Sequence, residues 1–161
     1  MLVRELARAD WPAVIALNEE SVDQLSDLDA ERLRYLLECA HRALVVEDAG
    51  AVVAFALAMA PGCDYDSINY RWFGERYERF LYLDRIAVDS SLRRRRIGAR
   101  LYDEMEDAAR EFERMVCEVN LEPANDASLA FHRARGYREL EQLRHPEKLV
   151  VLMTKELGGG D

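Results

Sequence analysis

The stretch Arg93-Arg94-Arg95-Arg96-Ile97-Gly98 stands between an apolar segment, Phe80–Val88, and an amphipathic segment that begins near Ile97. The first pattern predicts a strand and the second a helix, so the stretch is a turn that leads into a helix N-terminus. The first N–H groups of a helix lack partners, and the helix dipole adds partial positive charge there. The arginines raise the local potential further. The stretch therefore predicts a phosphate-binding turn in an α/β protein.

Length and composition favour one α/β domain. The chain has 161 residues, of which 50% are hydrophobic, and this is enough to bury a core. We predict one domain over residues 1–157 and a flexible tail over 158–161. No apolar run approaches the roughly 20 residues that span a bilayer, and the acidic start does not resemble a signal peptide. We therefore expect a cytoplasmic protein that does not bind membranes.

The charges and the cysteines argue against several other classes of protein. With 31 acidic and 22 basic residues the net charge is −9, which argues against nucleic-acid binding. Nucleic-acid binding through the arginine run nevertheless stays open as an alternative, as does a simple solvated patch. The 3 cysteines are scattered and odd in number, which fits a reducing compartment better than a disulfide framework. No cysteine or histidine cluster has metal-ligand spacing, so we expect no metal.

The remaining segments predict a mixed sheet with helices on both faces. Strands are expected at 2–6, 43–47, 51–60, 79–88, 115–121, 137–143 and 148–154, and helices at 10–20, from 29 onward, at 97–112 and at 125–135. Asp48-Ala49-Gly50 predicts an antiparallel hairpin, and the strand–helix–strand crossover over 80–121 predicts a parallel pair. Asp10, Asp29 and Asn125 are expected to begin helices. The aromatic segment Cys63–Glu78 has no clean period and is interpreted as a functional loop.

The element order and two motifs resemble the GNAT superfamily of acyl-CoA-dependent N-acetyltransferases, over nearly the whole chain. In that family the turn reads Arg/Gln-x-x-Gly-x-Gly/Ala, and Arg96 stands here where the first glycine is expected. An arginine at this position must hold a compatible φ and keep its side chain clear of the phosphate. The second motif, Asn125–Tyr137, resembles Asn-x-x-Ala-x-x-x-Tyr-x-x-x-Gly-Phe/Tyr, with His132 in place of the family tyrosine.

The resemblance implies a mixed, mostly antiparallel sheet whose central parallel strands, 80–88 and 115–121, splay apart to admit a pantetheine arm. It implies acetyl-CoA as co-substrate and direct transfer to an amine of a small molecule or peptide, bound by segments 21–29, 63–78 and 144–147. The residues expected to bind the co-substrate are Ile86, Ala87, Val88, Arg93, Arg94, Arg95, Arg96, Ile97, Gly98, Ala99, Asn125, Ser128, Phe131 and His132. A backbone N–H near Ile86 is expected to serve the oxyanion.

Three residues are candidates for acid–base chemistry. Glu118 lies on an otherwise apolar strand, where partial desolvation would raise its pKa toward that of a useful base. An ion pair with Arg85 or another arginine would explain Glu118 equally well, and for the rival base, Asp84, an arginine partner is the favoured interpretation. His132 would protonate the leaving thiolate, or it is a surface histidine. Strand alternation groups Glu118 with Val116 and Asn120, and Asp84 with Tyr82, Ile86 and Val88.

Alternatives remain for the function as a whole. Replacement of the motif glycine and of the usual tyrosine also fits a non-catalytic acyl-CoA sensor or scaffold that kept the fold. The aromatic segment 63–78 fits the wall of an acceptor site and equally a surface for a partner or a homodimer. The acidic surface would steer cationic acceptors toward the protein.

Overall fold

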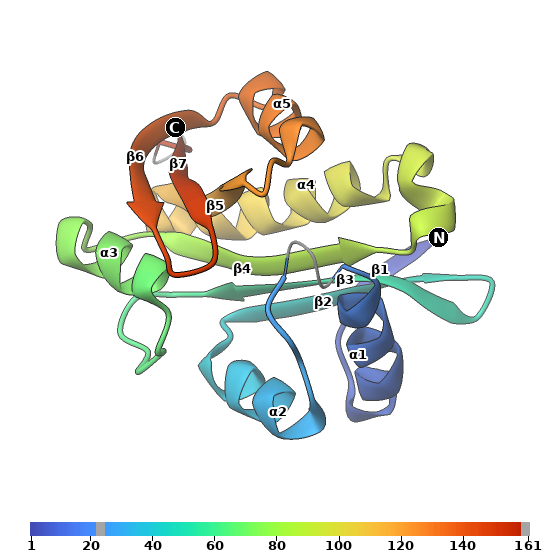
Figure 1. Ribbon diagram of the computed structural model, residues 1–161. Coiled ribbons are helices and arrows are strands. Elements are labelled where there is room, and N and C mark those ends of the chain that lie inside the picture. Colours follow the sequence, from blue (N-terminus) through green and yellow to red (C-terminus); the bar gives the residue numbers. More distant parts are fainter. Residues whose placement is uncertain (22–24, 159–161) are drawn as a thin grey trace.

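The computed structural model describes residues 1–21 and 25–158. These residues fold around a seven-stranded sheet (Figure 1). Its strands are β1 (Leu2–Glu5), β2 (Arg42–Asp48), β3 (Ala51–Met59), β4 (Leu81–Val88), β5 (Arg114–Glu122), β6 (Arg138–Arg144) and β7 (Leu149–Glu156). Their spatial order is β1-β2-β3-β4-β5-β7-β6, and only β4 and β5 pair in parallel. The predicted mixed, mostly antiparallel sheet is confirmed.

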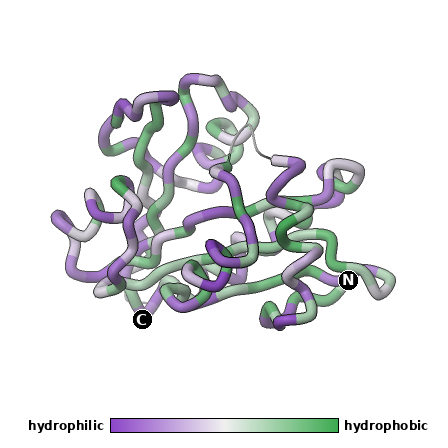
Figure 2. The backbone as a smooth tube through the Cα atoms, turned by 60° about the horizontal axis from the view of Figure 1, so that its bottom comes forward, coloured by the Kyte–Doolittle hydropathy of each residue, from purple (hydrophilic) through white to green (hydrophobic). Residues whose placement is uncertain are grey.

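Helices cover both faces of this sheet, as predicted (Figure 1). On one face lie α1 (Trp11–Glu20), α2 (Ala30–Cys39) and α3 (Ile68–Arg76), and on the other α4 (Ile97–Ala109) and α5 (Asp126–Ala134). Short 3₁₀ turns are η1 (Arg8–Asp10), η2 (Ser90–Arg95) and η3 (Arg110–Phe112). The central strands are mostly hydrophobic along their length (Figure 2), so each face of the sheet has its own buried cluster.

The parallel strands β4 and β5 pair only where they begin. Their register is Leu81 opposite Met115 and Tyr82 opposite Val116, and no later pair forms. Beyond this point β5 continues along β7, on its other side, while β4 continues along β3. The two strands thus diverge in the middle of the sheet, and the predicted splay is confirmed.

A β-bulge at Asp84 overturns one predicted strand face. The register of β3 with β4 skips Asp84, so this residue has no partner opposite it. A bulge of this kind inserts one residue and reverses the phase of the strand beyond it. Tyr82 accordingly packs in the cluster under α1, α2 and α3, whereas Ile86 and Val88 pack toward α4. The predicted common face of Asp84, Tyr82, Ile86 and Val88 is therefore wrong.

The aromatic segment Cys63–Glu78 contains a helix, α3, where a loop was predicted. The Ser67 hydroxyl accepts a hydrogen bond from the Tyr70 backbone N–H at 3.1 Å and so caps the helix. Tyr70 and Phe73 are buried beneath it. A serine followed by aromatic residues at helical spacing was the available signal, and the polar residues between them obscured it.

Most predicted helix ends are confirmed. Asp29 and Asn125 accept hydrogen bonds from backbone N–H groups of the helices that they precede, at 2.8 and 3.3 Å. Gly136 follows α5 with φ of +94°, the left-handed conformation expected there. Asp10 differs, because its carboxylate binds the Arg4 guanidinium at 2.7 Å and makes no cap bond to α1.

Cys39 and Cys63 form a disulfide, which contradicts the expectation of reduced, unpaired cysteines. Their Cα atoms are 5.7 Å apart, and the bond joins the end of α2 to the loop after β3. Cys117 is buried and free. Spacing could not show this pairing, because the two residues meet only when α2 is packed on the sheet. The cysteines therefore no longer support a reducing compartment.

Two further expectations concern absences and chain segments. Among the described residues no helix is long and apolar enough to cross a membrane, and no group of three or more potential metal ligands gathers. Residues 159–161 of the predicted tail and residues 22–24 of the predicted turn lie outside the described residues.

Candidate active site

A cavity of about 790 Å³ occupies the opening between β4 and β5. Most of the residues expected to bind the co-substrate line it: Ile86, Ala87, Val88, Arg93, Arg96, Gly98, Ala99, Asn125, Ser128, Phe131 and His132. Two do not, because Arg95 pairs with Asp48 at 3.3 Å and Ile97 is buried in the core. The Arg94 side chain lies outside the described part of the structure. The structure thus brings both sequence motifs to one cavity.

The turn before α4 has the backbone of a phosphate-binding site. Arg96 has φ of 61° and ψ of 25°, the left-handed conformation that glycine adopts most easily, and its side chain is exposed. The first turn of α4 receives no side-chain cap. A Cβ built on Gly98 would meet only Val88, at 3.9 Å, so the glycine keeps space open above the helix N-terminus. These features fit a bound pyrophosphate.

A second pocket, of about 290 Å³, adjoins the first and shares residues of β4 and β5 with it. It is lined by Leu25, Ser26, Arg32, Tyr65, Asp66, Ser67, Ile68, Asn69, Tyr82, Asp84, Arg85, Glu118, Asn120, His145 and Lys148. The three segments expected to bind the acceptor therefore supply walls of one small pocket, and Glu118 lines both cavities.

Glu118 is a desolvated carboxylate held by two neutral donors. The Tyr82 hydroxyl donates to both carboxylate oxygens, at 2.7 and 2.8 Å, and the Asn69 side chain also hydrogen-bonds the group. Burial raises the pKa of Glu118 to about 7, while the bonds from Tyr82 and Asn69 act in the opposite direction. The alternative of an ion pair with Arg85 does not apply, because Arg85 binds Asp84.

Asn69 is oriented from its other end by His145. The His145 Nε2–H donates to the Asn69 Oδ1 at 2.9 Å, so the amide nitrogen of Asn69 is left to face Glu118. Burial lowers the pKa of His145, which keeps the ring neutral at neutral pH. Because Asn69 comes from α3 and His145 from the β6–β7 turn, these two elements jointly set the donors around Glu118.

Asp84 is an ion-pair partner, as the favoured interpretation held. The Arg85 Nε donates to it at 2.7 Å, and the Tyr65 hydroxyl donates to its other oxygen. Arg85 is almost fully buried and also binds Asn18 and Ser26, which ties β4 to the α1–α2 connection. Asp84 is thus paired with a cation, whereas the hydrogen-bond donors on Glu118 are neutral, which makes Glu118 the carboxylate better suited to accept a proton.

His132 is buried, which excludes the alternative of a surface histidine. Its Nδ1–H donates to the Ser128 carbonyl at 2.7 Å, and its Nε2 lies 2.5 Å from the Tyr102 hydroxyl. With Nδ1 as the donor, a neutral ring accepts from Tyr102 at Nε2. Burial lowers the pKa of His132 and raises that of Tyr102, so both groups are neutral near pH 7. His132 stands where the family motif has a tyrosine, and the neighbouring Tyr102 supplies a protonated hydroxyl at this place.

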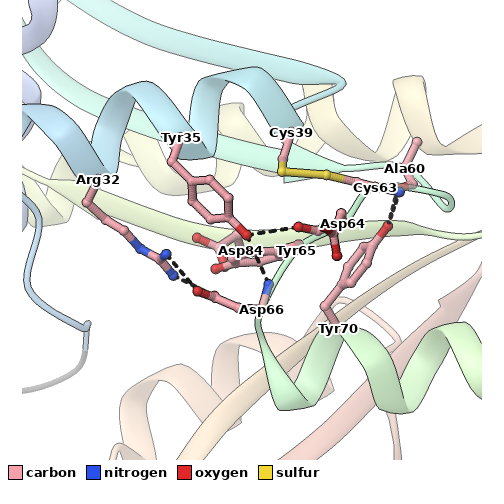
Figure 3. The surroundings of a disulfide bond; sticks show 10 residues. All are labelled: Arg32, Tyr35, Cys39, Ala60, Cys63, Asp64, Tyr65, Asp66, Tyr70 and Asp84. Atoms are coloured by element: carbon pink, nitrogen blue, oxygen red, sulfur yellow. Dashed lines mark hydrogen bonds and ion pairs between the residues drawn. A yellow bond between two sulfur atoms is a disulfide. The ribbon is translucent and has the colours of Figure 1, made fainter.

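The outer wall of the small pocket is fixed by α2 (Figure 3). The Arg32 guanidinium binds Asp66 at 2.8 and 2.9 Å, and the Tyr35 hydroxyl bonds the backbone of the same loop. The Cys39–Cys63 disulfide closes this set of contacts at the end of the helix. The loop that carries Tyr65 toward Asp84 is thus held at several points along α2.

Sequence reasoning missed several residues of the site. Tyr82 was only assigned to a strand face and Tyr102 was not singled out, but both are buried and each places its hydroxyl on a candidate catalytic side chain. Asn69 was hidden in the segment taken as a loop. Lys148 was read only as the start of a strand. None carries a local sequence signal for its role, because each role depends on a partner from another element.

The structure thus has a large cavity at the diverging strands and a smaller pocket beside it, with Glu118 lining both. The chain belongs to the acetyltransferase (GNAT) family, whose model matches residues 2–137, and it is an N-acetyltransferase. No curated protein sequence matches it significantly.

Solved structures of similar fold span both chains almost completely. A ribosomal-protein-alanine N-acetyltransferase from Brucella melitensis is 25% identical, with a TM-score of 0.73, over 98% of this chain and 100% of that one. Ard1 from Thermoplasma volcanium is 18% identical, with a TM-score of 0.78 and 97% of each chain covered. A putative acetyltransferase, yncA, from Salmonella typhimurium, solved with its cofactor acetyl-CoA, is 18% identical, with a TM-score of 0.71, over 98% and 94%.

Proposed function

We propose that this protein transfers the acetyl group of acetyl-CoA directly to the amine of a small molecule or peptide, with Glu118 as the general base. The position and protonation of Glu118 carry the proposal. It lies where the two cavities meet, and with a pKa of about 7 it is present in both protonation states at neutral pH. A group so poised can take the proton of an ammonium and return it to solvent.

The large cavity suits acetyl-CoA, which supplies an activated thioester when bound. The helix N-terminus behind Arg96 and the exposed Arg93 would hold its pyrophosphate. The diverging edge of β4 at Ile86–Val88 would accept its pantetheine arm as an extra strand, and a backbone N–H near Ile86 would serve the oxyanion. Asn125, already the cap of α5, lines the same cavity.

The chain's own groups account for the protons. Glu118 accepts the proton that the amine loses, and the C–S bond of the thioester breaks as the new C–N bond forms. The departing sulfur would take the Tyr102 hydroxyl proton as its hydrogen bond to His132 Nε2 breaks, and solvent in the cavity would then return a proton to Tyr102. His132 thus acts through its hydrogen bond to Tyr102 and stays neutral. Asp84 keeps its contacts with Arg85 and Tyr65 and takes no part in these proton transfers.

The proposal is tested by titrating acetyl-CoA in a calorimeter and by following CoA thiol release with a panel of amines and peptides. We expect saturable binding, and turnover that falls about tenfold or more in Tyr102→Phe and His132→Ala while acetyl-CoA binding is kept. Absence of binding at millimolar acetyl-CoA would overturn the proposal. Binding without turnover of any acceptor would favour the non-catalytic sensor instead.

A further inference from the structure

The charged side chains of the small pocket fall into two neutral pairs and two single charges. Arg32 binds Asp66, and Arg85 binds Asp84, so these four charges cancel locally. Lys148 and Glu118 remain. Among the described residues the Lys148 ammonium forms no ion pair, and its charge acts on Glu118 and His145 only through space.

Lys148 nevertheless faces the reaction site. It lines the small pocket, is half-buried, and sits in the β6–β7 turn, where its carbonyl accepts the His145 backbone N–H at 2.7 Å. Its positive charge lowers the pKa of both Glu118 and His145, so the ammonium acts on the groups around the base. The pocket therefore presents an anion at its inner end and an unpaired cation at its rim.

An acceptor amine arrives as a cation and loses its proton to Glu118. An ammonium bound there compensates the Glu118 carboxylate and leaves Lys148 without a counter-charge. A second cation on the acceptor would be repelled by Lys148, whereas an anionic group would pair with it in a partly desolvated pocket. The local charges thus oppose the cationic acceptors that the acidic net charge suggested.

Resting on the proposed acetyl transfer, we propose that the acceptor is a small amino-carboxylate, whose amine meets Glu118 and whose carboxylate meets Lys148. The pocket volume of about 290 Å³ suits a molecule the size of an amino acid. An acidic residue near a peptide N-terminus offers the same chemistry from a second source. A site built to pair a carboxylate discriminates strongly against an analogue that lacks it, because the lysine is then left unpaired.

The test measures kcat/KM by CoA thiol release with the twenty common L-amino acids, with the carboxamides of those that react, and with peptides that begin with the same residues. We expect amino-carboxylates to exceed their carboxamides by about tenfold or more. At pH 9, where Glu118 is ionised with or without the lysine, we expect the carboxylates to lose about 10- to 100-fold in Lys148→Met while the carboxamides stay within about twofold. Arg138→Met removes a cation from the far end of the same hairpin. It should change kcat/KM neither for the carboxylates nor for the carboxamides.

Each other outcome has a defined meaning. Carboxamides or diamines acetylated as well as carboxylates, or a Lys148→Met variant with unchanged preference, would overturn the inference and leave the acetyltransferase proposal standing. Acetylation of peptides at equal rates with and without an acidic residue near the N-terminus would also overturn the inference and leave the acetyltransferase proposal standing. Acidic peptides preferred over free amino acids would keep Lys148 as the anchor but overturn the free amino-carboxylate. Loss of acetyl-CoA binding in the calorimeter marks failure of the proposed function itself.

Discussion

The two cavities that meet at Glu118 are built in different ways. The larger one includes the edge of β4, the N-terminus of α4 and the cap of α5, so backbone groups placed by local motifs contribute to its wall. The smaller one is formed by side chains from α2, α3, β4, β5 and the β6–β7 turn. A site made of backbone tolerates sequence change, as the arginine at position 96 illustrates. A site made of converging side chains sets specificity and depends on each contributing element.

The largest effect expected is that of Glu118→Gln, at the junction of the two cavities. Loss of the base should reduce kcat by about 100- to 10,000-fold, while acetyl-CoA, held in the larger cavity, binds as before. Steady-state kinetics and calorimetry measure the two effects. Glu122→Gln, at the exposed end of the same strand, serves as the control. Retention of wild-type kcat would rule out Glu118 as the base.

The same variant has a second readout. The folded-state pKa of Glu118, about 7, lies above its ordinary value of 4.5, so its contribution to stability is present below pH 4.5 and is lost as pH rises through 7. As pH rises from 5 to 9, the free energy of unfolding of Glu118→Gln should therefore increase relative to that of the native chain. Urea unfolding measures this difference. An unchanged difference across this range would contradict the raised pKa.

Of the two cavities, only the smaller one should be affected by removal of the disulfide. In Cys39→Ser/Cys63→Ser, release of the link between residues 24 apart should lower the free energy of unfolding by about 3 kcal/mol. The loop that carries Tyr65 should loosen, so KM for the acceptor rises while acetyl-CoA affinity stays. The native protein in a reducing agent should match the variant. Equal stability of oxidised and reduced native protein would show that the disulfide contributes nothing to stability.

The hydroxyl of Tyr82 should influence how kcat/KM depends on pH. The base must be ionised, so kcat/KM should fall as pH drops below about 7. The Tyr82 hydrogen bonds favour the carboxylate, so Tyr82→Phe should shift the rising limb toward higher pH. Tyr35→Phe removes a hydroxyl that bonds only the nearby loop and should leave the limb in place. A shift toward lower pH in Tyr82→Phe would overturn this assignment.

The smallest effect expected is in the backbone of the larger cavity. Arg96→Gly removes the backbone strain of a non-glycine residue in the left-handed conformation. It should raise the free energy of unfolding by about 0.5–1 kcal/mol, with acetyl-CoA bound at least as tightly. Arg95→Gly, at a position without positive φ, should instead destabilise the turn. Urea unfolding and calorimetry measure both variants. A destabilised Arg96→Gly would mean that the arginine side chain contributes more than the strain costs.

The sequence predicted those parts of the site whose signals are local. Hydrophobic periodicity located all seven strands, and cap residues marked the starts of α2 and α5. Strand alternation correctly grouped Glu118 with Val116 and Asn120, because β5 has no irregularity before Asn120. It failed for Asp84, because the bulge depends on how β3 pairs with β4.

By itself, then, the sequence determined the α/β sheet, the turn that leads into α4 and the carboxylate on β5, because each depends on the spacing of neighbouring residues. Only the tertiary structure decided the partners, namely Tyr82 and Asn69 on Glu118, Tyr102 on His132, and Cys39 with Cys63, and it alone brought Lys148 to the small pocket. These contacts join residues distant in the chain, and their strength comes from burial that exists only after the layers have packed.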